Sequence, residues 1–364
     1  MNATRIAIVG AGLSGLYAAW LLERRNMKDY VLLEARDVVG GRIETIASPA
    51  SADSGRYDLG PTWFWPGFQP GLDRLVDDLG LERFAQHEHG ATLLERSAAE
   101  AATRIPNQAS TGSMRLGKGM SALPEALRQR LDPARVVTGR AVRHLRRTVD
   151  GVELCAVDAM GRGSPWHAQQ VLLALPPRLA CAISFSPALP VPLARQWKAT
   201  STWMAPHAKY LALYDTPFWR ERGLSGAARS AHGPMVEIHD ASSPHGSAAL
   251  FGFLGVPARA RRGVADDVLR RHCRAQLVRL FGEAAGCPRL DLIKDWASDP
   301  WTAVEDDLEA VPGHAAAPDA VPVSGPWRDR LTGIASEWSR EFPGHLAGAV
   351  DAASRGVSRQ AIGC

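Results

Sequence analysis

The sequence predicts an α/β fold in which a parallel sheet is interrupted by a segment of different character, and two observations lead to this prediction. Residues 5–9 and 30–34 are apolar and rich in β-branched side chains, as buried parallel strands require, and a helix over 16–25 connects them. Residues 205–256 are instead rich in separate strands and precede a helix over 266–281. The chain is therefore expected to contain a β-α-β core and an inserted α+β region. A third apolar strand is expected over 171–175, and the small, polar stretch over 97–113 is expected to be a loop.

The glycines between the first strand and the first helix predict a nucleotide-binding loop. Gly10 lets the chain turn tightly, Gly12 lets a pyrophosphate approach the backbone, and Gly15 lets the helix pack closely on the strand. The helix N-terminus adds free N–H groups and a partial positive charge. Glu34 ends the second strand, where it can accept hydrogen bonds from a ribose hydroxyl and would repel the 2′-phosphate of NADP. This pattern predicts a Rossmann-type dinucleotide-binding domain and leaves NAD and FAD open.

Length and composition exclude several other classes of protein. A chain of 364 residues, 46% of them hydrophobic, can bury a sizeable core in one large domain or two. The net charge is only +4 and the arginines are scattered, so no nucleic-acid partner is expected. The five cysteines show no metal-ligand spacing and no disulfide framework, which predicts no metal site and suits a reducing, cytoplasmic location. The apolar run over 7–22 contains the nucleotide-binding glycines, so we expect neither a signal peptide nor a membrane span.

Residues 34–42 decide between the two cofactors. Their sequence, Glu-Ala-Arg-Asp-Val-Val-Gly-Gly-Arg, resembles the segment after the second strand in the flavin-containing monoamine oxidase family. In that family the paired glycines and the arginine lie along the FAD pyrophosphate, because bare backbone and a guanidinium suit a diphosphate. Further segments resemble the family in order and spacing, at residues 57–63, 115–120, 209–220, 335–338 and 344–350. The resemblance covers most of the chain and implies FAD.

The resemblance implies a discontinuous architecture. Residues 1–66, 112–196 and 292–364 would form the FAD-binding domain, and residues 67–111 and 197–291 would form an inserted α+β substrate-binding domain. The chain is short for the family, so the substrate domain is expected to be trimmed.

A set of cofactor-binding residues follows from the glycine motif and the resemblance together. They are Gly10, Gly12, Gly15, Glu34, Ala35, Arg36, Gly41, Arg42, Gly60, Pro61, Thr62, Trp63, Val142, Glu337, Gly344, His345 and Leu346. The backbone of Val142 would meet the adenine ring. Glu337 would contact the ribityl chain or the pyrophosphate, or would be a helix N-terminal acid stabilised by the dipole. The cysteine that carries a covalent flavin link in some members is missing from the matching segment, so FAD is expected to be noncovalent.

Two residues are expected to act in catalysis. Lys209 matches the family's active-site lysine, with the same spacing to Pro-Phe-Trp-Arg, and would hold a water near flavin N5. The alternative is a surface lysine on an edge strand. His345 occupies one of the two positions at which the family often places aromatic rings around the substrate nitrogen, and it would donate a hydrogen bond to substrate or pack as a core histidine.

The expected aromatic cage is altered, and its replacement is open at this stage. The second ring position falls near Asp306, so the cage would be absent or rebuilt from Trp301 or Trp338. Trp63 and Trp65, with Phe64 between them, would wall the substrate cavity or pack in the core.

The activity implied by the resemblance is oxidation of a small amine to an imine, by hydride transfer to flavin N5. Water would hydrolyse the imine, and oxygen or another acceptor would reoxidise the flavin. No arginine stands out as a carboxylate clamp, which favours amines over amino acids. Two alternatives stay open: a dehydrogenase, desaturase or isomerase acting on a non-amine substrate, or an FAD-binding protein that has lost catalysis.

Overall fold

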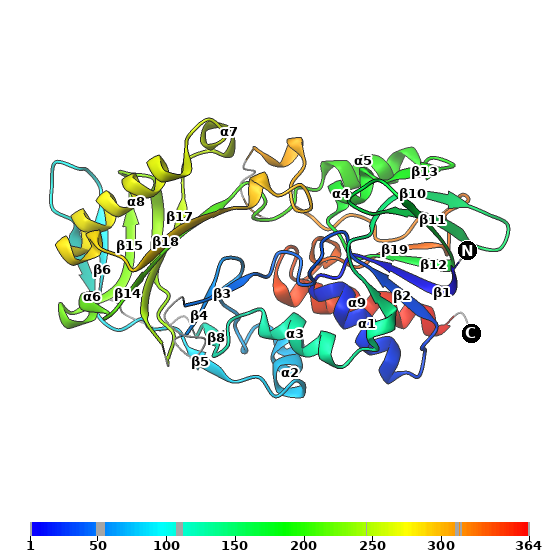
Figure 1. The fold of residues 1–364 in the computed structure, drawn as a ribbon, viewed down its shortest axis with the longest axis horizontal. Coiled ribbons are helices and arrows are strands. Elements are labelled where there is room, and N and C mark those ends of the chain that lie inside the picture. The colour runs from blue at the N-terminus through cyan, green and yellow to red at the C-terminus, as the bar shows by residue number, and fades with distance from the viewer. Residues whose placement is uncertain are drawn as a thin grey trace.

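Two β-sheets organise the molecule, and the computed structural model describes them within residues 2–48, 55–106, 112–244, 246–309, 313 and 315–362. An eight-stranded sheet lies at one end and a seven-stranded sheet at the other, as Figure 1 shows. Both chain termini lie at the end that holds the eight-stranded sheet.

The predicted β-α-β unit is confirmed at the centre of the eight-stranded sheet. Strand β1 (Asn2–Val9) pairs in parallel with β2 (Tyr30–Leu33) and with β12 (Gly163–Leu173), and α1 (Leu13–Arg24) connects β1 to β2. The sheet order is β13-β10-β11-β12-β1-β2-β9, and β19 also pairs with β12. Its other strands are β9 (Val136–Val137), β10 (Ala141–Arg147), β11 (Val152–Val157), β13 (Ser184–Ser186) and β19 (Leu331–Gly333).

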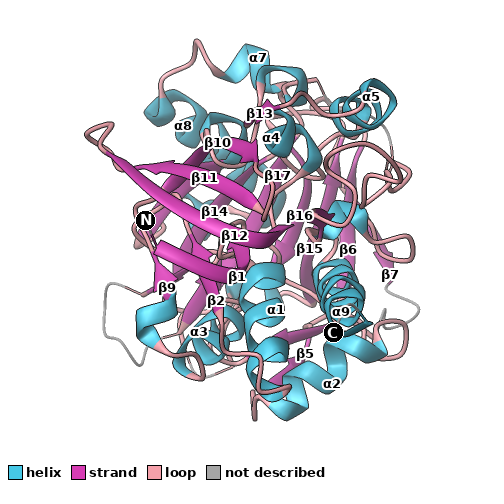
Figure 2. Ribbon diagram, turned by 90° about the vertical axis from the view of Figure 1, so that its right-hand side faces the viewer, coloured by secondary structure: helices cyan, strands magenta, loops and turns pink. Residues whose placement is uncertain are grey.

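Alternate residues of β1 enter two hydrophobic cores, which is the period-two pattern of a strand buried on both faces. Ile6 and Ile8 pack among α1, α3 (Ala122–Gln129) and α9 (Leu346–Ile362). Ala7 and Val9 belong to the other core, with α4 (Pro177–Cys181) and α5 (Val191–Ala199). Figure 2 shows the two groups of helices on opposite sides of this sheet. Because α9 packs on α1, the two ends of the chain share one core.

The seven-stranded sheet has the order β18-β14-β17-β16-β15-β6-β7. Helix α8 (Asp266–Phe281) has the predicted bounds and packs on one face, where its Cys273 and Leu277 meet Tyr210 and Tyr214 of β14. The opposite face carries Leu211 and Leu213 and packs with residues near β4. The strands are β6 (Ala91–Glu95), β7 (Thr103–Pro106), β14 (Ala208–Tyr214), β15 (Leu224–Ser230), β16 (Met235–Asp240), β17 (Ala248–Leu254) and β18 (Leu290–Asp295).

Smaller elements lie between and beside the two sheets. They are β3 (Thr45–Ala47) with β4 (Arg56–Asp58), β5 (Arg83–Ala85) with β8 (Met114–Leu116), α2 (Pro70–Asp78), α6 (Phe218–Glu221), α7 (Ala258–Arg261), and the 3-10 helices η1 (Pro133–Arg135), η2 (Glu283–Gly286), η3 (Trp296–Ser298), η4 (Glu305–Asp307) and η5 (Ser336–Trp338).

One local prediction is wrong and one domain boundary falls inside a strand. The small, polar stretch over 97–113 was expected to be a loop, but β7 lies within it and pairs with β6; residues 107–111 lie outside the described part. All four residues of β7 are exposed, so this edge strand lacks an apolar pattern. The third predicted FAD-binding segment begins at residue 292, within β18 of the seven-stranded sheet. Within the described residues, none of the helices has both the length and the apolar character that crossing a membrane requires.

Candidate active site

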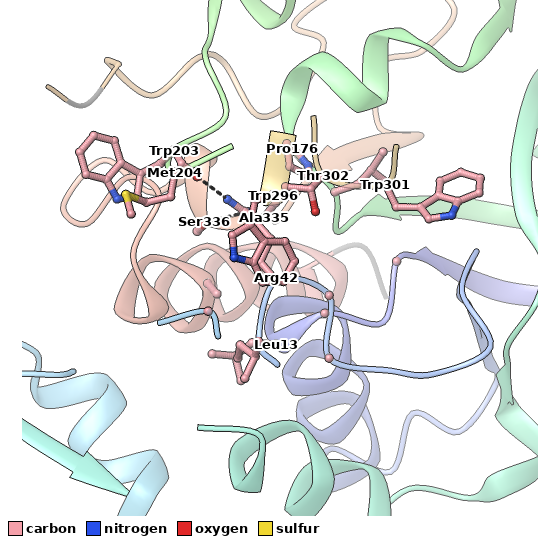
Figure 3. Close-up of a pocket in the computed structure, with 18 of the residues that line it drawn as sticks. Leu13, Arg42, Pro176, Trp203, Met204, Trp296, Trp301, Thr302, Ala335 and Ser336 are labelled. Carbon is pink, nitrogen blue, oxygen red and sulfur yellow. Dashed lines mark hydrogen bonds between the residues drawn. The ribbon is translucent and has the colours of Figure 1, made fainter. Parts of the chain in front are cut away.

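A cavity of about 740 Å³ is lined by residues of both sheets and of the loops between them. Nearly all of the predicted cofactor-binding residues line it, together with Lys209; the two that do not are Gly15 and Glu337. Figure 3 shows part of this cavity, with Trp203 and Met204 at one side, Trp301 at the other, and Leu13 and Arg42 between them. Its volume is in the range of ligand and cofactor sites.

The fold requires glycine at two positions of the glycine motif but not at the third. A side chain at Gly15 would place its Cβ 1.9 Å from the carbonyl oxygen of Gly10, so this glycine lets α1 approach the loop. Gly10 itself has a φ of +102°, which favours glycine. Gly12 has ordinary backbone angles, and its Cβ would meet only the Cα of Gly41, at 3.8 Å. Because nothing in the chain demands a glycine there, Gly12 fits the bare backbone that a diphosphate needs.

Glu34 organises the loops around the cavity and is 4% exposed. Its Oε2 accepts a hydrogen bond of 2.6 Å from the amide of Ala11, and its Oε1 accepts one of 2.9 Å from the amide of Arg36. A carboxylate has about four lone-pair sites, so it can still accept a ribose hydroxyl. The position agrees with the predicted role.

The end of the cavity beside Glu34 is lined by Trp301 and by two arginines, each of which contacts a partner side chain. Arg36 donates to the carboxylate of Asp299 at 2.6 Å, and the guanidinium of Arg143 lies 4.9 Å from the ring centre of Trp301. Trp301 therefore lies at the nucleotide end, opposite Trp203 in Figure 3.

Neither tryptophan proposed from the sequence rebuilds the substrate cage. Trp301 is at the wrong end of the cavity, and Trp338 is buried in the core, with its ring 5.3 Å from that of Trp197. Asp306, at the second ring position of the family, does not line the cavity; its carbonyl accepts a hydrogen bond from Arg178.

Arg42 and Glu337 form a bidentate ion pair, with N–O distances of 2.6 and 3.0 Å. Arg42 also donates to Ser336 Oγ and lines the cavity, whereas Glu337 lies behind it with a side chain that is 3% exposed. Glu337 therefore meets the cavity through the guanidinium, which it orients. An oriented guanidinium beside bare glycine backbone suits a diphosphate.

Replacing Glu337 by glutamine should lower the free energy of unfolding of the apoprotein by about 2–3 kcal/mol, because it leaves Arg42 without a buried counter-charge. Urea denaturation with FAD absent measures this change. Glu153→Gln is the matched control, since Glu153 pairs with the largely exposed Arg146 and such surface pairs contribute less than about 1 kcal/mol. Equal effects of the two substitutions would contradict the prediction.

Lys209 extends from β14 into the cavity and is 2% exposed. Its ammonium donates to the carbonyl oxygens of Asp58 and Gly60, at 2.9 and 2.8 Å, and to Thr62 Oγ1 at 2.7 Å. It also lies 4.2 Å from the ring centre of Phe251. Because β14 lies between β17 and β18 in the sheet, the alternative of a surface lysine on an edge strand is wrong.

Burial lowers the pKa of Lys209 from 10.5 to about 7, and the nearby Asp58 only partly opposes this effect. The folded protein therefore holds this proton less tightly than the unfolded chain does. The stabilising contribution is fully present above the unfolded pKa of 10.5 and is lost as the pH falls through about 7.

We accordingly expect the stability of the wild type, relative to Lys209→Met, to increase as the pH rises from 7 toward 10.5. The increase should be on the order of 4 kcal/mol. Urea denaturation of both apoproteins across this range measures it. A difference that stays constant with pH would show that the lysine has an ordinary pKa.

Aromatic and imidazole rings line the end of the cavity near Lys209. The ring of Trp203 lies 6.3 Å from that of His345 and 6.4 Å from that of His207. Burial and the charge of Arg261 lower the pKa of His207, so its ring is neutral at pH 7. Trp63 also lines the cavity.

The run of three aromatic residues at 63–65 divides between cavity and core. Trp63 and Trp65 line the cavity, whereas Phe64 is 1% exposed and packs among α1, α3 and α9. Both interpretations of this run are therefore partly correct, as the alternation of a near-extended chain requires.

Several lining residues lie outside the motifs that predict the site, namely Trp203, His207, Glu237, Phe253 and Trp296. Trp203 packs on Gly344, whose φ of +79° favours glycine and whose Cβ would lie 2.4 Å from the Cβ of Trp203. This contact joins residues far apart in the chain, so no local pattern indicates it. Glu237 could have been noticed, because it is an acidic residue within the strand-rich stretch over 205–256.

The fold and the cavity define an FAD-dependent oxidoreductase, with a Rossmann-type domain and a second sheet that supplies a buried lysine. Residues 84–359 match the family described as flavin containing amine oxidoreductase, and residues 8–79 match the NAD(P)-binding Rossmann-like domain. The chain belongs to the flavin containing amine oxidoreductase family.

Individual relatives extend this similarity over almost the whole chain. Putrescine oxidase of Kocuria rosea is 25% identical, covering 94% of this chain and 92% of that protein. A flavin-containing amine oxidase of Danio rerio is 26% identical, covering 99% of this chain and 86% of that protein. A solved structure of wild-type putrescine oxidase bound to putrescine has a TM-score of 0.83 at 22% identity, with 99% of each chain covered, and confirms the predicted fold class.

Proposed function

We propose that this chain oxidises a small amine with a noncovalently bound FAD. The observation that carries the proposal is the placement of Lys209: a buried ammonium extends into the same cavity as the glycine loop. The family supports amine oxidation over the alternatives of a non-amine substrate or a lost activity.

The lining residues would hold FAD along the length of the cavity. Gly12, Gly41 and Arg42 suit the diphosphate, and Glu34 suits the ribose of the adenosine half, with the backbone of Val142 nearby. When bound, FAD supplies the two-electron oxidation of the substrate. These residues would bind and orient it.

The remaining lining residues act on the substrate and on water. The rings of Trp203, Trp63 and Phe253 form an apolar wall that excludes water. The three N–H groups of the Lys209 ammonium donate to Asp58, Gly60 and Thr62, so the group would act as a positive charge at the cavity wall. A pKa near 7 lets it exchange a proton at neutral pH. His207 and His345 also line this end of the cavity and would orient the amine.

Noncovalent attachment is supported by the chemistry of the wall, since no cysteine occurs among the described residues that line the cavity. The cysteines at 155, 181, 273 and 287 are free thiols, which suits the predicted cytoplasmic location; Cys364 lies outside the described residues. The separate cores of the two sheets support the division into an FAD-binding and a substrate-binding domain. Oxygen is the proposed electron acceptor.

The proposal is tested on purified protein. We expect a flavin absorbance spectrum, release of all the flavin as FAD into the supernatant after acid precipitation, bleaching by an amine under anaerobic conditions, and hydrogen peroxide after air is admitted. Protein that is colourless and does not take up added FAD would refute cofactor binding. A bound flavin that no amine in a broad panel bleaches would refute amine oxidation.

A further inference from the structure

The substrate end of the cavity contains a carboxylate that the proposed amine oxidation does not use. Among the described residues that line the cavity, the carboxylates are Glu34 and Glu237. Glu34 belongs to the nucleotide loop and binds two backbone amides. Glu237 lies on β16 of the other sheet, beside Phe253 of β17.

The sheet register places Glu237 on the same face as Lys209. Phe253 of β17 is directly opposite Lys209 of β14 on one side and Glu237 of β16 on the other. Residues that are directly opposite in an antiparallel sheet point to the same face. The three side chains therefore form one row across neighbouring strands, and all three line the cavity. Two strand spacings put the ends of the row roughly 10 Å apart.

Two groups face Glu237, and both contact the same oxygen. His239 Nε2 lies 2.9 Å from Oε1, and Arg229 on β15 lies 3.7 Å from it. Arg229 is 72% exposed, so it neutralises the carboxylate only weakly. The hydrogen bond from His239 lowers the pKa of Glu237, which is therefore ionised at neutral pH.

We propose that Glu237 binds a second cationic nitrogen of the substrate, so that the chain takes aliphatic diamines or polyamines. This inference rests on the proposed amine oxidation. The C–N bond at one end is oxidised to the imine near Lys209, and the aliphatic chain crosses the ring of Phe253. The distal ammonium reaches the carboxylate at the other end of the row. A monoamine of the same length leaves Glu237 without this partner.

The size of the effect follows from the contact. A charge-assisted hydrogen bond between a distal ammonium and a partly desolvated carboxylate corresponds to on the order of a ten- to hundredfold difference in affinity. The aromatic ring between the two ends adds a favourable surface for the methylene chain and for a cation.

The experiment compares cadaverine with pentylamine, which have the same five-carbon chain, on FAD-loaded wild type, Glu237→Gln and Asp267→Asn. Asp267 lies on α8 with a side chain that is 58% exposed, so Asp267→Asn removes a negative charge far from the cavity lining. Anaerobic stopped flow gives the flavin reduction rates. Calorimetry on enzyme previously reduced with dithionite gives amine affinity without turnover.

We expect wild type and Asp267→Asn to prefer cadaverine over pentylamine by ten- to a hundredfold in both measurements, and Glu237→Gln to lose the preference. Equal handling of the two amines by the wild type, or a preference that survives in Glu237→Gln, would overturn the inference. If both amines reduce the flavin equally well, amine oxidation stands and the inference fails. If neither amine reduces the flavin but cadaverine binds more tightly than pentylamine and loses this advantage in Glu237→Gln, the inference stands and the proposed amine oxidation fails.

Discussion

Replacing Gly12 by alanine should strongly weaken FAD binding while leaving the apoprotein folded. The added Cβ would meet only the Cα of Gly41, at 3.8 Å, so the free energy of unfolding should change by less than about 0.5 kcal/mol. The methyl group would instead occupy cavity space where the diphosphate approaches the backbone, which should weaken FAD binding on the order of a hundredfold or more. Fluorescence titration of the apoprotein with FAD measures the affinity.

Gly15→Ala is the matched control, because it adds the same methyl group three residues further along the chain, in the first turn of α1. Its Cβ would lie 1.9 Å from the carbonyl oxygen of Gly10, so helix α1 must move away from the strand. We expect a loss of about 3 kcal/mol or more in unfolding free energy. If Gly12→Ala destabilises the apoprotein as much as Gly15→Ala, or if it binds FAD normally, Gly12 does not serve the cofactor.

Replacing Lys209 by methionine should slow flavin reduction or reoxidation by on the order of a hundredfold, because it removes the only ammonium among the described residues that line the cavity. The methionine keeps the length of the buried side chain, so its packing against Phe251 should survive. Stopped-flow spectroscopy measures the two half-reactions separately, first by mixing with amine anaerobically and then by mixing the reduced enzyme with oxygen.

Lys294→Met provides the control for charge. Lys294 is directly opposite Lys209 on the neighbouring strand β18, but its ammonium pairs with Glu44 at 2.5 Å and does not line the cavity. Both substitutions remove one positive charge from the same sheet, and only Lys209→Met removes it from the cavity. Half-reactions that are unchanged in Lys209→Met would reject the assigned role.

The parts of the fold that local sequence determines were predictable. The glycine loop, the apolar strands beside it and α8 each have a pattern whose physical cause lies within a few residues. Strand β7 was missed because its residues, Thr103–Pro106, are all exposed and form a strand only by pairing with β6. Strand β12 extends back to Gly163, further than the predicted apolar run at 171–175, because its first half pairs with β11 in an antiparallel hairpin.

The site divides in the same way between local and distant determinants. Residues within motifs, such as Gly12 and Lys209, were identified because spacing along the chain marks them. Trp203 was missed because its place in the cavity depends on packing against His345, more than a hundred positions away, and His207 was missed because it lies beside Trp203. Glu337 was assigned a direct cofactor contact, which is still a prediction; in the structure it reaches the cavity through Arg42.

The ion pair between Arg42 and Glu337 has a consequence for how the protein is made. Residues from the first fifty positions and residues 335–349 line the same cavity, and α9 packs on α1. During synthesis the early part of the chain leaves the ribosome long before its partner wall exists. A nascent chain halted before residue 335 would thus have an open nucleotide loop with one wall missing, so capture of the cofactor has to await the synthesis of residues 335–349.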